Sequence, residues 1–135
     1  MQTIQSLDEL NIPQDYKTCI SDFLQNLADI PYISRVILFG GCAKEQVHKH
    51  SDIDIFITSS RELSLDEELY ILGECHPESA LGNKSLDIIV QPEETFFKNI
   101  NSFGMVQKQV YKHGVDISEP LRQRAGAGTS RFVLD

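Results

Sequence analysis

Two aspartates lie in a stretch that otherwise has the composition of a buried strand. Asp52 and Asp54 alternate with Ile53 and Ile55 in the sequence Ser51-Asp-Ile-Asp-Ile. Residues two apart on a strand point to the same face, so we expect both carboxylates on one face and the isoleucines on the other. Burying ionised carboxylates is costly unless positive charge lies against them. Oxygen ligands on a rigid element suit a hard cation such as Mg²⁺, with Mn²⁺ as a substitute, so the pattern predicts a metal-dependent enzyme.

A glycine pair precedes these aspartates and a third aspartate follows them. Gly40 and Gly41 end an apolar run, twelve residues before Asp52, and Asp87 interrupts a later apolar run over 86–90. Glycines allow unusual backbone angles and let amide groups approach a phosphate closely. Three carboxylates from neighbouring strands can hold two divalent ions, an arrangement suited to in-line displacement at phosphorus. We therefore expect Asp52, Asp54 and Asp87 to be both metal ligands and catalytic residues.

The segments that must position these residues alternate between helical and strand patterns. Apolar spacings of three and four predict a helix over 14–29, and Ser64 with Glu67 has the spacing of a capping box that begins a helix over 64–74. We expect Leu65, Leu69 and Leu72 to form the buried stripe of that second helix. The remaining patterns predict strands over 35–39, 53–58 and 86–90, a short edge strand over 115–117, and helices over 42–46, 93–101 and 103–113.

This alternation predicts an α/β (α+β) fold, a small mixed sheet flanked by helices. We expect one domain over residues 1–117, with Phe96, Phe97 and Phe103 in its core, and a C-terminal tail over 118–135 that carries no periodic apolar face.

Charge and composition exclude some classes of function. The chain has 12 basic and 20 acidic residues, a net charge of −8, which makes direct nucleic-acid binding an unfavourable expectation. This net charge is compatible with a small anionic ligand that is held through Mg²⁺. No apolar run approaches the roughly 18 residues of a membrane span, and three widely spaced cysteines suggest reduced thiols. We expect a cytoplasmic protein.

The block over residues 36–57 resembles the nucleotidyltransferase superfamily that includes DNA polymerase beta, and most closely its small bacterial members, the minimal nucleotidyltransferases. The family pattern is an apolar strand, Gly-Ser or Gly-Gly, an Ala-Arg-Gly-like stretch and Ser-Asp-x-Asp, which Gly40-Gly41 and Ser51-Asp-Ile-Asp54 match. The third family carboxylate falls on Asp87, and the resemblance covers roughly residues 14–117.

The resemblance implies roles for these positions. Asp52 and Asp54 would hold two Mg²⁺ ions, Asp87 would complete the second metal site and orient or deprotonate the attacking hydroxyl, and the amides of Gly40 and Gly41 would cradle phosphates. Two further candidates for nucleotide binding have open alternatives. Lys44 is either a phosphate contact or a solvated loop lysine, and Ser51 either touches phosphate or hydrogen-bonds its own turn.

The resemblance also implies a biology. Relatives of this size often accompany a helical HEPN-family ribonuclease toxin and act as its antitoxin, some by transferring AMP from ATP to a toxin tyrosine. The expected partners are therefore a nucleoside triphosphate and a HEPN-type protein. Gly41 replaces the serine of many relatives, and Lys44-Glu45 replaces Arg-Gly. These departures leave an alternative, a catalytically weak binding module that neutralises or scaffolds its partner by contact.

Overall fold

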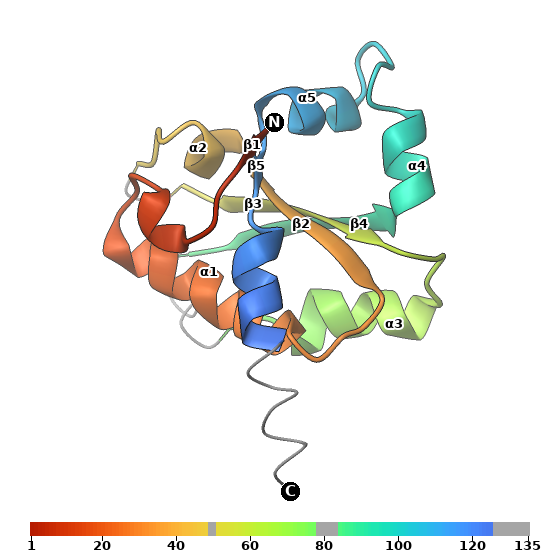
Figure 1. Ribbon diagram of the computed structural model, residues 1–135, viewed down its shortest axis with the longest axis horizontal. Helices are drawn as coiled ribbons and strands as arrows, with labels where there is room; N and C mark the ends of the chain where they lie inside the picture. Colours follow the sequence, from red (N-terminus) through yellow and green to blue (C-terminus); the bar gives the residue numbers. More distant parts are fainter. Residues whose placement is uncertain (49–50, 78–83, 126–135) are drawn as a thin grey trace, which may run out of the picture.

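A mixed sheet forms the centre of the structure, a computed structural model that describes residues 1–48, 51–77 and 84–125. Strand β2 (Ile33–Phe39) runs antiparallel to β3 (Ile53–Ser59) and to β5 (Val115–Asp116). Strand β3 pairs in parallel with β4 (Leu86–Pro92), and β1 (Gln2–Thr3) pairs in parallel with β5. Helices flank both faces of the sheet, so the predicted α/β fold is confirmed (Figure 1). Within the described residues the sheet order is β1, β5, β2, β3 and β4.

The two faces of the sheet carry separate hydrophobic cores. The larger core packs helix α1 (Gln14–Leu27) against Ile53, Ile55 and Ile57 of β3. The smaller core on the other face joins strand residues to helices α4 (Glu93–Lys98) and α5 (Val106–His113), and its buried members are Ile37, Phe56, Phe96 and Val110. The alternation along β3 is therefore as predicted, and Asp54 shares its parity with Phe56 on the face of the smaller core.

The predicted capping box is present, but the predicted buried stripe is wrong. Helix α3 (Leu65–Leu69) begins after Ser64 and continues as a π-helical turn over Tyr70–Glu74. Three leucines expected in the core are exposed to 70%, 54% and 43%, namely Leu65, Leu69 and Leu72. Ile71 and Cys75, which are four residues apart, belong to the larger core instead, so this segment packs through the face that carries them. The π turn is closed by a 3.1 Å hydrogen bond from the Cys75 amide to the Tyr70 carbonyl.

The C-terminal half departs from the predicted pattern in two places. β5 is not an edge strand, because β1 pairs along its other side. The predicted helices over 93–101 and 103–113 are shortened to α4 and α5 by a turn in which Gly104 has a φ of +77°. Phe103 lies in that turn and is 96% exposed, so its predicted place in the core is wrong, whereas Phe96 is fully buried.

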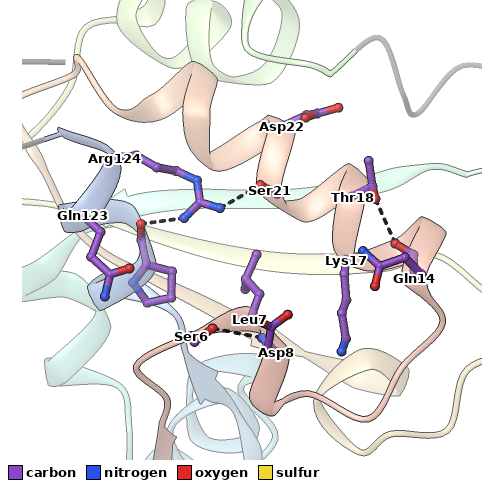
Figure 2. A pocket seen from close by; sticks show the side chains of 11 residues that line it. Ser6, Leu7, Asp8, Gln14, Lys17, Thr18, Ser21, Asp22, Gln123 and Arg124 are labelled. Atoms are coloured by element: carbon purple, nitrogen blue, oxygen red, sulfur yellow. Dashed lines mark hydrogen bonds between the residues drawn. The ribbon is translucent and has the colours of Figure 1, made fainter. Parts of the chain in front are cut away.

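Part of the expected C-terminal tail is helical and packs on the domain. Residues 118–125 form a helix whose Ser118 and Leu121 are buried. The guanidinium of Arg124 donates 2.7 Å hydrogen bonds to the Ser21 hydroxyl of α1 and to the Pro120 carbonyl (Figure 2). A hollow of about 280 Å³ lies between this helix, α1 and the N-terminal segment, and none of the predicted site residues lines it. The rest of the predicted tail, 126–135, lies outside the described residues.

Two further observations concern helix length and the cysteines. In the portions of the chain that are described, no helix is long and apolar enough to cross a bilayer. The three cysteines, Cys19, Cys42 and Cys75, are all buried. Burial raises the pKa of Cys42 and of Cys75 to about 11, with a further contribution from Asp54 at the first and Glu74 at the second.

Candidate active site

The register of the sheet brings two of the three predicted carboxylates side by side. Asp54 of β3 and Asp87 of β4 are Cα partners in the parallel pairing, so their side chains lie on the same face. Asp52 comes one residue before β3 and is exposed, rather than lying within the strand. Its carboxylate accepts a hydrogen bond from the hydroxyl of Ser85, which comes one residue before β4. All three aspartates therefore belong to the starts of two adjacent strands.

Like charge accumulates at this point of the sheet. The pKa of Asp54 is raised from its ordinary value, first by partial burial and then by the negative charges of Asp87 and Asp52. The clustering of carboxylates is thus unfavourable for the ionised protein on its own. Its electrostatic cost is of the kind that a bound cation removes.

The three aspartates suit a divalent ion in the chemistry of their oxygen atoms but not in the arrangement of their side chains. Three carboxylates with unneutralised charge form the donor set that Mg²⁺ or Mn²⁺ prefers. In the described residues, however, no three histidine, cysteine, aspartate or glutamate side chains are gathered so that they could hold a metal ion. The donor chemistry fits the predicted cofactor, and the side chains as they stand do not form a ligand set.

Gly40 packs directly against the Asp54 carboxylate. It follows Phe39, the Cα partner of Asp54, and begins helix α2 (Gly40–Ala43). The short helix predicted over 42–46 therefore begins two residues earlier than expected and includes both glycines. Its φ is +66°, a region that favours glycine, and a Cβ atom at this position would overlap the Asp54 carboxylate. The sequence needs glycine here for two independent reasons, backbone conformation and lack of space.

The residues after Gly40 form a tight turn. The carbonyl of Gly40 accepts from the Lys44 amide at 3.1 Å, and that of Gly41 accepts from the Gln46 amide at 2.9 Å. Lys44 is exposed, and with Gly40 it lines a hollow beside the end of β2. Glu45 has a φ of +57°, and its carboxylate accepts a hydrogen bond from the Asn11 amide in the segment before α1. The negative charge of Glu45 is thus engaged with the N-terminal segment.

Ser51 hydrogen-bonds its own turn. Its hydroxyl accepts from the His48 amide at 2.7 Å, and its amide donates to the His48 carbonyl at 3.0 Å. The structural alternative for Ser51 is therefore realised, while a contact with phosphate stays a prediction.

Tyr16 supports this turn from α1, a role that its place in the apolar pattern of the helix did not reveal. Its hydroxyl lies 2.9 Å from the Ser51 carbonyl and 3.2 Å from the His48 carbonyl. Lys84, just before β4, lies over the Tyr16 ring with its Nζ 5.3 Å from the ring centroid and 2.7 Å from the Asp15 carboxylate. Two consecutive residues of α1 thus fix the approaches to Asp52 and Asp87. The contacting residues lie too far apart along the chain for any sequence pattern to reveal these contacts.

Comparison with known proteins decides the family. A family model described as a nucleotidyltransferase domain matches residues 20–117. The chain belongs to the nucleotidyltransferase family. All residues predicted for the nucleotidyltransferase site lie inside the matched region, and the predicted family and fold are confirmed. Their individual roles in catalysis and nucleotide binding stay predictions.

Other comparisons add little to this assignment. No curated protein matches the chain significantly. A similar solved structure is described as "Crystal structure of the toxin-antitoxin with AMP-PNP", with 20% identity, a TM-score of 0.48 and coverage of 89% of this chain and 87% of that one. At that identity and TM-score, the likeness supports no conclusion about function.

Proposed function

We propose that the protein is a Mg²⁺-dependent nucleotidyltransferase that moves AMP from ATP to a hydroxyl group of a partner protein. The observation that carries the proposal is the pairing of Asp54 with Asp87 on adjacent strands, with Gly40 packed against the Asp54 carboxylate. Carboxylates beside a glycine turn join a cation-binding group to a place where a phosphate can approach the backbone. Membership of the nucleotidyltransferase family supplies the reaction class.

The residues take the following roles in this proposal. Asp52, Asp54 and Asp87 would hold the divalent ions, which when bound supply charge neutralisation at the phosphates. Asp87 is exposed, and it orients the acceptor hydroxyl and accepts its proton. Gly40, Gly41 and Lys44 bind the phosphates that leave.

The reaction is a displacement at the α-phosphorus. The acceptor oxygen forms a bond to this phosphorus, the bond from the same phosphorus to the β-phosphate bridging oxygen breaks, and pyrophosphate leaves. The chain contributes mainly by positioning the reactants and stabilising charge, as is general for phosphoryl and nucleotidyl transfer.

The proposed acceptor is a helical HEPN-type toxin, for which this protein would be the antitoxin. The feature that favours a protein partner is the exposed apolar surface formed by Leu65, Leu69 and Leu72 on α3 and the turn that follows it. Exposed acidic side chains accompany it, among them Asp66 and Glu74. A partner with an apolar contact surface and a basic rim is complementary to this face in both respects.

The experiment is a transfer assay. The protein is incubated with Mg²⁺, ATP labelled at the α-phosphate and the product of the adjacent gene, and the acceptor is examined by mass spectrometry. We expect a gain of one AMP that disappears with Asp54→Asn or Asp87→Asn and persists with Glu94→Gln, which changes an exposed carboxylate on α4. If no nucleotide is transferred while a tight complex forms, the enzymatic proposal is wrong.

A second candidate function is a binding module that neutralises its partner by contact alone. The exposed leucines of α3 favour it, as does the absence of a ready metal-ligand set among the described residues. The same assay separates the two, because contact neutralisation predicts a complex that Asp54→Asn leaves intact and that Leu65→Ser with Leu69→Ser weakens.

A further inference from the structure

A hollow of about 170 Å³ lies where the end of β2 meets helix α5. Of the described residues, it is lined by Phe39, Gly40, Lys44, Gln109 and His113. Gly40 and Lys44 belong to the predicted phosphate-binding turn. The other two polar side chains come from a helix about 70 residues further along the chain, whose sequence gave no sign of a functional role.

The packing of Gly114 explains how closely the end of α5 approaches β2. A side chain on Gly114 would overlap the Val110 carbonyl and the Ile37 side chain, so only glycine allows the helix end to lie this close to β2. The Gly114 amide donates a 2.8 Å hydrogen bond to that same carbonyl, and the Val110 side chain is fully buried in the smaller core. The end of α5 is thus held against β2 a short distance before β2 runs into Gly40.

Gln109 and His113 both project from this anchored end. They are four residues apart on a helix, so they occupy the same face one turn apart. Both side chains are exposed, and an amide and an imidazole can each donate a hydrogen bond to an oxyanion.

The charge of the lining favours an anion. The described residues around the hollow include a lysine and a histidine and no carboxylate, although the whole chain carries a net charge of −8. The Asp54 carboxylate lies against Gly40 but does not line the hollow. Gly40 therefore adjoins both a hollow whose lining suits an anion and a carboxylate that suits a cation, and a metal-bound polyphosphate requires both.

We propose that Gln109 and His113 complete, with Gly40 and Lys44, a binding site for the outer phosphates of a nucleoside triphosphate. This inference rests on the proposed function and adds two residues of α5 to the site. A ligand without β- and γ-phosphates would gain nothing from the hollow. AMP is therefore expected to bind independently of His113.

The test uses inorganic tripolyphosphate, which carries the phosphate chain without base or sugar. Its affinity is measured by calorimetry in a fixed concentration of Mg²⁺ for the wild type, Gln109→Ala, His113→Ala and the double variant. Each single substitution is expected to weaken binding about tenfold, since each removes one hydrogen bond to a charged group. The matched control is Lys112→Ala, which removes a positive charge from the same turn of α5 but does not line the hollow.

The outcomes separate this inference from the proposed function. Equal affinity in the wild type and the double variant, or no binding of tripolyphosphate by the wild type, overturns the inference. Loss of affinity in Lys112→Ala as large as in His113→Ala also overturns it, because general electrostatics would then explain the effect. If tripolyphosphate binding depends on His113 but no AMP is transferred to any acceptor, the site stands and the catalytic proposal fails.

Discussion

The carboxylate of Asp54 occupies the space that a side chain on Gly40 would need. Gly40 directly follows strand β2, and Asp54 lies in its antiparallel neighbour β3, so the contact joins the glycine turn to the aspartate cluster. Five predictions follow from this and related contacts.

Gly40→Ala should disable the site and destabilise the fold. The positive φ of residue 40 costs a non-glycine residue about 1–2 kcal/mol, and the added methyl group must also displace the Asp54 carboxylate. We expect a lower melting temperature and loss of nucleotide transfer. Gly73→Ala is the control, because Gly73 has no atom within 4 Å of its Cβ position and should tolerate alanine. Equal melting temperatures for both variants would contradict the steric argument.

Asp54→Asn should raise stability and abolish activity together. Burial and the charges of Asp87 and Asp52 raise the pKa of Asp54, so its ionised form destabilises the metal-free fold. A raised carboxyl pKa means that the folded state loses stability as pH rises above the ordinary value of 3.8. In metal-free buffer at pH 7 the variant should melt at a higher temperature than the wild type, and the difference should vanish below about pH 3.8. A lower melting temperature at pH 7 would show that Asp54 stabilises the fold.

Tyr16→Phe should loosen the approach to Asp52. The hydroxyl that bonds the Ser51 and His48 carbonyls is lost, which should reduce the free energy of unfolding by about 1 kcal/mol. Transfer should slow by about tenfold, because small misplacements of a ligating residue are costly. Tyr70→Phe, at an exposed tyrosine, is the control. A variant that is less stable but fully active would restrict Tyr16 to a structural role.

The N-terminal cap of α3 should make the stability of the protein depend on pH in the acid range. Arg61 and the Ser64 amide bind the Glu67 carboxylate and lower its pKa to about 2. A depressed carboxyl pKa contributes stability that is complete above the ordinary value of 4.5 and is lost as pH falls toward 2. Glu67→Gln should therefore melt below the wild type at pH 7, with the gap closing between pH 4.5 and 2. Asp66→Asn, in the same turn, should show a smaller gap at pH 7.

The exposed leucines of α3 should contribute little to folding. Leu69→Gln is expected to change the free energy of unfolding by less than about 0.5 kcal/mol, as is usual for surface positions. Leu24→Ala, in the larger core, should cost about 2–5 kcal/mol, measured by urea denaturation. If the two substitutions have similar effects, Leu69 is buried in solution and the surface available for a partner is smaller than described.

The elements that could be predicted well from the sequence are those whose patterns depend on residues close together along the chain. The alternation of isoleucines fixed the buried face of β3, and Ser64 with Glu67 marked the start of α3, because both patterns depend on neighbours a few residues away. Asp87 could be grouped with Asp54 through the family resemblance and the expectation that their strands are neighbours, and β3 and β4 do pair with these two residues in register.

The errors have long-range or subtle causes. The helical spacing of the leucines of α3 predicts a buried stripe, yet the segment packs through Ile71 and Cys75, and spacing alone does not tell which helical face meets the core. β1 has two residues and no pattern of its own, so β5 was taken for an edge. Tyr16 and Gln109 lie more than 20 residues from the aspartates, and only the folded chain brings them to the loop before Asp52 and to the hollow beside Gly40.

The burial of the three cysteines has a practical consequence for measuring ligand binding. Thiolate is the reactive form of cysteine, and the raised pKa values of Cys42 and Cys75 leave little of it at neutral pH. A cysteine introduced by Lys112→Cys, exposed beside His113, would therefore be labelled selectively by a maleimide fluorophore without removing native residues. The fold thus offers a ready position for an optical reporter of ligand binding at the end of α5.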